Sequence, residues 1–109
     1  PHRYSRTAEF LEPFAQALSQ ADAVLLAPLY AAGEAPMAGI SSEALAAAVQ
    51  RIAPELPLAV SSNLDQLAEQ VATHSRPGDL VLAMGAGDVN SLWGRLQARL
   101  APAVLPLAA

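Results

Sequence analysis

The sequence predicts an α/β layer fold with a mainly parallel sheet. Helical and strand-like patterns alternate strictly along its 109 residues, which is the order that βαβ units produce. The strand-like segments are continuous apolar runs, such as AVLLAPLY at 23–30, and such runs are typical of strands buried on both faces. This length fits one domain. Hydrophobic residues make up 53% of the chain, which is enough to form a core.

The first third of the chain predicts a helix and then a strand. Residues 7–20 form the helix, with Pro13 expected to bend it or delay its start. The strand covers 23–30 and should end near Pro28, which cannot donate to a sheet. A loop rich in Gly and Pro follows at 31–39. The apolar side chains that fall on one face of the helix are Leu11, Phe14, Leu18 and Ala21.

The remaining segments continue the alternation. Ser41 or Ser42 is expected to cap a helix that runs to about Ile52. Asn63 with Gln66 forms a predicted capping pair for the helix after it. Asp88 is the expected cap of the last helix, and we make no prediction for the tail from Pro102. The other predicted elements are a strand at 58–61, a turn at 76–79, a strand at 80–84 and a glycine-rich break at 85–87.

The composition excludes several classes of function. The net charge is −4 and there is no lysine, which argues against a nucleic-acid binder and excludes a GxxxxGK[ST] phosphate loop within this chain. The absence of cysteine removes disulfides, thiol catalysis and thiolate metal sites. No apolar run reaches the length of a membrane helix and no signal peptide is visible, so we expect a cytoplasmic protein without membrane contact. No self-contained set of catalytic residues is present.

Polar and glycine-rich segments follow the predicted strands. In open parallel sheets, ligands bind beyond the carboxyl ends of the strands. The loops at those ends are 31–39, 61–63 and 85–90. If a strand precedes Pro1, the segment 2–6 is a fourth loop on the same edge. We therefore expect these segments to share one rim.

Two of these segments could face a ligand. Arg3 and Arg6 could clamp a carboxylate or a phosphate by paired hydrogen bonds, or they form a solvated basic terminus. The loop Gly85-Ala-Gly87-Asp88 could hold an anion on its backbone amides, or it is a tight turn with Asp88 as a helix cap.

Other polar side chains give weaker indications. Tyr30 and Glu34 follow the first strand, and Glu34 could bind a cation or an amine or remain solvated. His2 and His74 have no partner at metal-ligand spacing, so we predict no metal site.

Three segments together resemble the carboxyl-terminal domain of the Mur ligases. They are Pro1-His-Arg-Tyr-Ser-Arg-Thr7, Tyr30-Ala-Ala-Gly-Glu-Ala-Pro36 and Gly85-Ala-Gly-Asp88. They are most similar to the member that joins L-alanine to UDP-N-acetylmuramate in peptidoglycan synthesis. The resemblance implies a three-layer, dinucleotide-binding-type (Rossmann-like) fold whose first strand is missing here.

The same resemblance implies how such a domain works. It closes over ATP and L-alanine, while ATP and Mg²⁺ are handled mainly by the central domain of the full-length enzyme. His2, Arg3 and Arg6 match the substrate-binding segment of the family, and no catalytic residue of the central domain has a counterpart here. We therefore expect residues 1–109 to be inactive alone and to self-associate through an open sheet edge.

Two other functions remain open. The chain could be a stand-alone module that binds a nucleotide or an anion without enzymatic activity. It could also belong to a Mur-type ligase that recycles whole peptides, although the HRYSR segment speaks against that branch.

Overall fold

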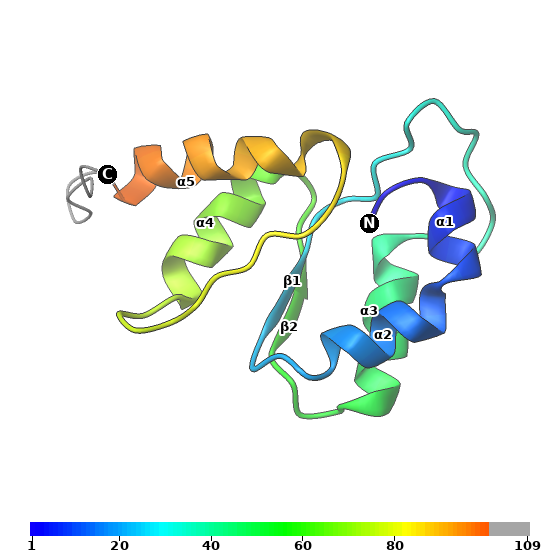
Figure 1. The fold of residues 1–109 in the computed structure, drawn as a ribbon, viewed down its shortest axis with the longest axis horizontal. Helices are drawn as coiled ribbons and strands as arrows, with labels where there is room; N and C mark the ends of the chain where they lie inside the picture. The colour runs from blue at the N-terminus through cyan, green and yellow to red at the C-terminus, as the bar shows by residue number, and fades with distance from the viewer. Residues whose placement is uncertain (101–109) are drawn as a thin grey trace.

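A computed structural model describes residues 1–100, and residues 101–109 lie outside the described part of the chain. Five α-helices, one 3-10 helix and two strands occur in that part (Figure 1). None of its helices is both long and apolar enough to cross a membrane. The elements are α1 (Tyr4–Glu9), α2 (Leu11–Leu18), β1 (Val24–Leu26), α3 (Ser42–Ile52), β2 (Leu58–Val60), α4 (Leu64–His74), η1 (Gly87–Ser91) and α5 (Leu92–Leu100).

The two strands are parallel neighbours, with Val24 opposite Leu58 and Leu26 opposite Val60. Two backbone hydrogen bonds extend the pairing, from Val24 N to the Pro57 carbonyl and from Ser61 N to the Leu26 carbonyl. Helices α2 and α3 cover one face of this sheet, and α4 and α5 lie on the other (Figure 1). The predicted α/β fold with helices in layers on both faces of a parallel sheet is confirmed.

The core consists of two hydrophobic clusters that meet at β1. Successive side chains of a strand point to opposite faces, so β1 contributes to both. Val24 and Leu26 are buried on the α2–α3 face, and Leu25 packs on the α4–α5 face. The other buried members are Ala15, Leu45, Ala48 and Val49 on the first face and Leu67, Ala68 and Leu92 on the second.

The helix predicted at 7–20 is divided in two. Helix α1 ends at Glu9 and α2 begins at Leu11, with Phe10 between them at φ −112° and ψ 20°. Pro13 explains the break because its ring would clash with the carbonyl of Glu9 four residues earlier in a continuous helix. Placed in the first turn of α2, Pro13 lacks only an amide that would have no helical partner.

Both predicted capping sites are confirmed. The Ser41 hydroxyl accepts a hydrogen bond from Ala44 N at 3.0 Å, and Ser42 is instead buried and donates to the Ala27 carbonyl at 2.6 Å. The Asn63 side chain accepts from Gln66 N at 2.7 Å. The second bond of this pair differs from the expectation, because the Gln66 amide oxygen accepts from Ser62 N.

The prediction of a strand at 80–84 is wrong. This segment follows the expected turn, in which Asp79 N donates to the Arg76 carbonyl at 3.0 Å, but it forms no strand. Its side chains still alternate in exposure. Leu80, Leu82 and Met84 are between 70% and 84% exposed, and the residues between them are half-buried.

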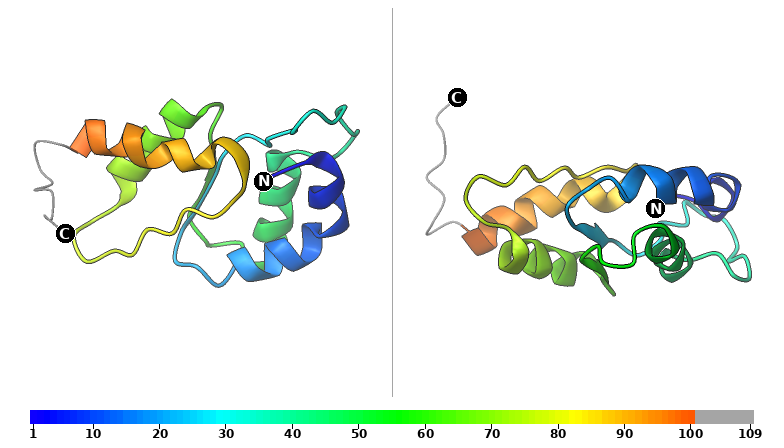
Figure 2. Two further views of the ribbon diagram at one scale, coloured as in Figure 1. Left: turned by 45° about the horizontal axis from the view of Figure 1, so that its top comes forward. Right: turned by 90° about the horizontal axis from the view of Figure 1, so that it is seen from below.

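Right-handed connections explain why this segment has no partner. Helix α3 joins β1 to β2 over one face, and α4 leaves β2 over the opposite face (Figure 1). A right-handed crossover on the opposite face must return past β1, and the chain at 80–84 does run on that side (Figure 2). Within residues 1–100, β1 pairs with β2 only, and the bridge of His2 with Tyr30 lies beyond the end of β1. The segment 80–84 therefore has no described neighbour to bond.

The last helix also starts later than predicted. Residues 87–91 form the 3-10 helix η1, whose N-cap is Ala86, and no side chain caps it. The prediction that Asp88 caps the last helix is therefore wrong. Asp88 lies in the first turn of η1 instead, and its carbonyl accepts a hydrogen bond from the Ser91 hydroxyl at 2.9 Å.

Candidate functional site

The amino-terminal segment joins the end of the first strand through backbone and aromatic contacts. Arg3 N donates to the Tyr30 carbonyl at 2.6 Å. The His2 imidazole stacks on the Tyr30 ring, with centroids 5.5 Å apart and planes 14° from parallel. Tyr30 is therefore the point at which two of the sequence motifs meet.

The glycine-rich loop packs on the same tyrosine. Gly87 has φ +84°, a left-handed conformation that favours glycine. A β-carbon at this position would lie 2.5 Å from Cδ1 and 2.7 Å from Cε1 of Tyr30. The absence of a side chain at Gly87 is thus what allows the loop to approach the ring. All three motifs come together around Tyr30, as the shared-rim prediction required.

Glu34 makes a second link between the first two motifs. Its Oε1 accepts from Ser5 N at 3.0 Å and its Oε2 accepts from the Ser5 hydroxyl at 2.5 Å. These hydrogen bonds from Ser5, with a smaller contribution from the charge of Arg3, hold the pKa of Glu34 below its ordinary value. The Glu34 carboxylate is thus bound to Ser5 through both of its oxygens.

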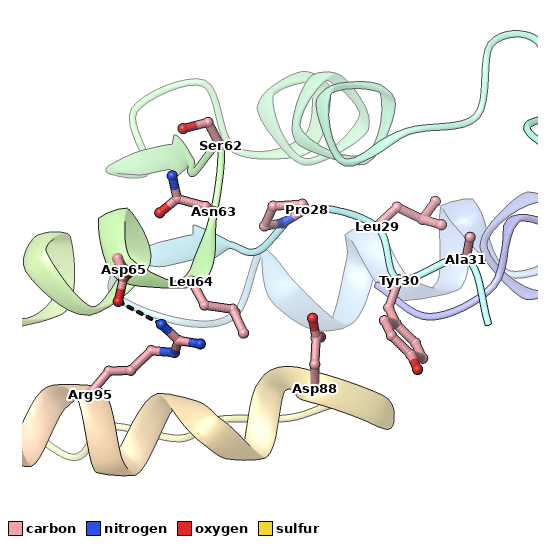
Figure 3. A pocket seen from close by; sticks show the side chains of 10 residues that line it. All are labelled: Pro28, Leu29, Tyr30, Ala31, Ser62, Asn63, Leu64, Asp65, Asp88 and Arg95. Carbon is pink, nitrogen blue, oxygen red and sulfur yellow. Dashed lines mark hydrogen bonds and ion pairs between the residues drawn. The ribbon is translucent and has the colours of Figure 1, made fainter. Parts of the chain in front are cut away.

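A cleft of about 420 Å³ opens at the carboxyl ends of β1 and β2 (Figure 3). It lies where the chain passes from one face of the sheet to the other, which is the usual ligand position in open α/β folds. Three of the predicted rim segments contribute to it. The lining residues are Pro28, Leu29, Tyr30, Ala31, Ser62, Asn63, Leu64, Asp65, Asp88 and Arg95.

One wall of the cleft is an ion pair that sequence reasoning missed. Arg95 Nη1 on α5 lies 2.6 Å from Asp65 Oδ1 on α4 (Figure 3). Both side chains are partly exposed, at 39% and 66%. Neither residue belongs to a motif. Their opposite charges are the one feature of the sequence that could have indicated the pair, and the spacing does not predict that their two helices pack together.

The cleft is lined by both hydrogen-bond donors and acceptors. The Asp88 side chain points toward it (Figure 3) and makes no hydrogen bond within residues 1–100. The guanidinium of Arg95 is already paired to Asp65, so part of its charge is compensated within the protein. No three His, Asp or Glu side chains in the described part of the chain gather as ligands for one metal ion.

The two arginines lie outside this cleft, beside Tyr30. Arg3 and Arg6 are both exposed, and neither forms an ion pair with any residue from 1 to 100. The Arg6 guanidinium carbon lies 5.6 Å from the centre of the Phe10 ring. Gly85, Gly87 and Glu34 do not line the cleft either, so the predicted site residues do not form one pocket.

Comparison with known sequences identifies relatives over most of the chain. Residues 2–87 match the family described as "Mur ligase, glutamate ligase domain". A UDP-N-acetylmuramate–L-alanine ligase of Synechococcus sp. (strain CC9605) is 62% identical over 96 residues, which are 88% of this chain and 20% of that protein. Proteins of the same name from Prochlorococcus marinus (strain MIT 9303) and Hyphomonas neptunium (strain ATCC 15444) are 60% identical over 96 residues and 45% identical over 100. These two matches span 88% and 92% of this chain and about a fifth of each relative.

Proposed function

Because this chain belongs to the Mur ligase family, we propose that it is the carboxyl-terminal domain of a UDP-N-acetylmuramate–L-alanine ligase. The relatives that match most of its length carry that name. The observation that carries the proposal is the meeting of all three motif segments around Tyr30. Tyr30 is 38% exposed, so packing of the hydrophobic core does not explain why the three segments meet there.

Arg3 and Arg6 are the proposed anion-binding residues. They are exposed, lie at the carboxyl edge of the sheet and have no acidic partner within residues 1–100. Two guanidinium groups suit the carboxylate of L-alanine or a phosphate of ATP, because each can donate paired hydrogen bonds to two oxygens. His2 supports this segment by stacking on Tyr30.

Closure of this domain over ATP and L-alanine would bring the arginines to the reacting groups without introducing water. In this proposal the domain acts by positioning, and the Ser5 hydroxyl, which donates to Glu34, supports the arginine segment and does not act as a nucleophile. The described residues of the domain contain no cluster suited to Mg²⁺, so the metal that accompanies ATP belongs in this proposal to the rest of the enzyme. The chain alone is accordingly proposed to be inactive, and the enzyme to work in the cytoplasm.

The test uses the full-length protein that contains this chain. Purified protein should consume ATP and join L-alanine to UDP-N-acetylmuramate, with product identified by mass spectrometry. A preference for L-alanyl peptides over L-alanine would support the recycling ligase instead. Failure of both reactions, together with nucleotide binding by residues 1–109 alone, would support a stand-alone binding module.

A further inference from the structure

We infer that Glu34 is a positioning residue, which holds the segment carrying Arg3 and Arg6 in its binding geometry. The role of Glu34 in substrate binding rests on the proposed function, whereas its contact with Ser5 is present in the structure whatever the function is. Both carboxylate oxygens of Glu34 are used, one by the amide and one by the hydroxyl of Ser5. Ser5 lies between the two arginines and is 29 residues away from Glu34 in sequence.

Helix α1 requires such an outside partner. It has only six residues, and its N-cap Arg3 provides no side-chain hydrogen bond. The amides of the first turn have no partner within a helix, and a helix this short is unstable without external contacts. A carboxylate at the first turn satisfies an amide and interacts favourably with the helix dipole. Glu34 supplies from a distant loop the cap that the local sequence lacks.

The backbone on both sides of Ser5 is held as well. Arg3 adopts φ 59°, a left-handed conformation that is unfavourable for a residue with a side chain. Its amide donates to Tyr30, and its carbonyl accepts from the hydroxyl of the fully buried Thr7 at 2.8 Å. Loss of the Ser5 contact would leave this strained turn fixed at two points rather than three.

The same contact explains why the loop after Tyr30 contains an acidic residue. Glu34 is anchored at its own amide, which donates to the Ala31 carbonyl at 3.1 Å, so a short turn presents the carboxylate to α1. A neutral amide of the same length could also accept from Ser5, as the Gln66 oxygen does from the amide and hydroxyl of Ser62, but it would lack the charge that strengthens these bonds. The carboxylate therefore joins the 31–39 loop and the arginine segment into one unit.

The test measures order and kinetics separately in the full-length protein. Hydrogen exchange followed by mass spectrometry should show exchange in residues 4–9 about tenfold faster in Glu34→Ala, because a charge-assisted hydrogen bond is lost. Exchange in 64–74 should not change. Ser5→Ala should have a smaller effect, and Ser5→Thr, which keeps the hydroxyl, should restore the parental rate. Glu55→Ala is the matched control, since Glu55 is exposed and forms no hydrogen bond within residues 1–100.

Steady-state kinetics then separate positioning from direct binding. Glu34→Ala should raise KM for L-alanine or ATP roughly tenfold, and the double variant with Ser5→Ala should add little to it, because both changes break one contact. A raised KM with unchanged exchange in 4–9 would mean that Glu34 binds substrate itself, which overturns the inference. Unchanged exchange and unchanged KM overturn it as well. Faster exchange with parental kinetics would show that the contact orders α1 without affecting substrate binding, which overturns the positioning role while leaving the ligase activity itself intact. Absence of ligation by the parent protein would instead be the failure of the proposed function.

Discussion

The ring of Tyr30 occupies the space that a side chain on Gly87 would need, with Cδ1 2.5 Å from the position of a β-carbon. The ring also stacks on His2, so it is held between two motif segments. Substituting Gly87 must therefore displace the tyrosine as well as strain the loop.

We expect Gly87→Ala to lower the free energy of unfolding by about 2–4 kcal/mol, of which roughly 1–2 kcal/mol comes from the left-handed backbone and the rest from displacing the ring of Tyr30. Urea denaturation would measure this. Gly39→Ala is the matched control, because Gly39 has φ +77° and no atom within 4 Å of its added β-carbon. Gly94→Ala should be neutral or stabilising, since Gly94 lies in helix α5 with open space around it. Equal losses for Gly87→Ala and Gly39→Ala would show that the contact with Tyr30 is unimportant.

Replacing Arg3 or Arg6 by Ala in the full-length protein should lower kcat/KM for L-alanine or ATP roughly ten- to hundredfold, since a hydrogen bond to a charged group contributes about 1.5–3 kcal/mol. Lysine should restore activity only in part, because it cannot donate the paired contact. Stability should change little, apart from about 0.5–1 kcal/mol for the contact of Arg6 with Phe10.

Arg51→Ala is the control for this pair of variants. Arg51 forms an exposed ion pair with Glu12 at 3.2 Å, a kind of contact that contributes about 0–1 kcal/mol. It should leave the kinetics unchanged. Parental kinetics for both Arg3→Ala and Arg6→Ala would reject the clamp and favour a solvated terminus.

The lowered pKa of Glu34 predicts how its contribution depends on pH. Hydrogen bonds from Ser5 favour the charged carboxylate in the folded state, so the unfolded state takes up a proton first as the pH falls. The stabilisation is therefore complete above the ordinary pKa of glutamate and is lost as the pH falls through the lowered value. Urea midpoints of the parent and Glu34→Gln should differ at neutral pH and converge in acid. A difference that grows toward acid pH would contradict this sign.

The exposed row on 80–84 predicts self-association of residues 1–109. Leu80, Leu82 and Met84 present apolar side chains, and within the described residues β1 pairs with β2 only, so one of its edges is open. Open edges with apolar side chains recruit other chains. Light scattering should show concentration-dependent association that Leu82→Lys weakens. Ile52→Lys, at a residue 44% exposed on α3, should not. A stable monomer at high concentration would count against this edge as a contact surface.

Periodicity and capping patterns predicted the helices and the two paired strands because these depend on local sequence. Asn63 and Ser41 cap their helices as their position before an apolar periodic segment indicated. The segment 80–84 was predicted as a strand from the same kind of pattern, but a strand exists only when a neighbour hydrogen-bonds to it. Local composition does not record whether that neighbour is present.

The sequence predicted which motifs form the candidate site, but it did not predict the contacts between their side chains. The shared edge of parallel strands predicted that Tyr30 and Gly87 lie together, and they do, although the strand expected before Gly87 does not form. The partner of Glu34 could not be read from spacing, because Ser5 is one of several polar residues in the first segment. The Asp65–Arg95 pair depends on how α4 packs against α5, which no local pattern fixes.

The strand β1 has only three residues, and adjacent side chains belong to different hydrophobic clusters. Deleting one residue within it would turn Leu25 toward α2 and α3 and would move its neighbours toward α4 and α5. Both layers would then lose their contacts at once. The connection at 75–79 contributes no residue to either cluster, whereas 53–57 does so through Leu56. Variation in length among related chains is therefore expected to collect at 75–79, while β1 tolerates exchange of one apolar residue for another but neither insertion nor deletion.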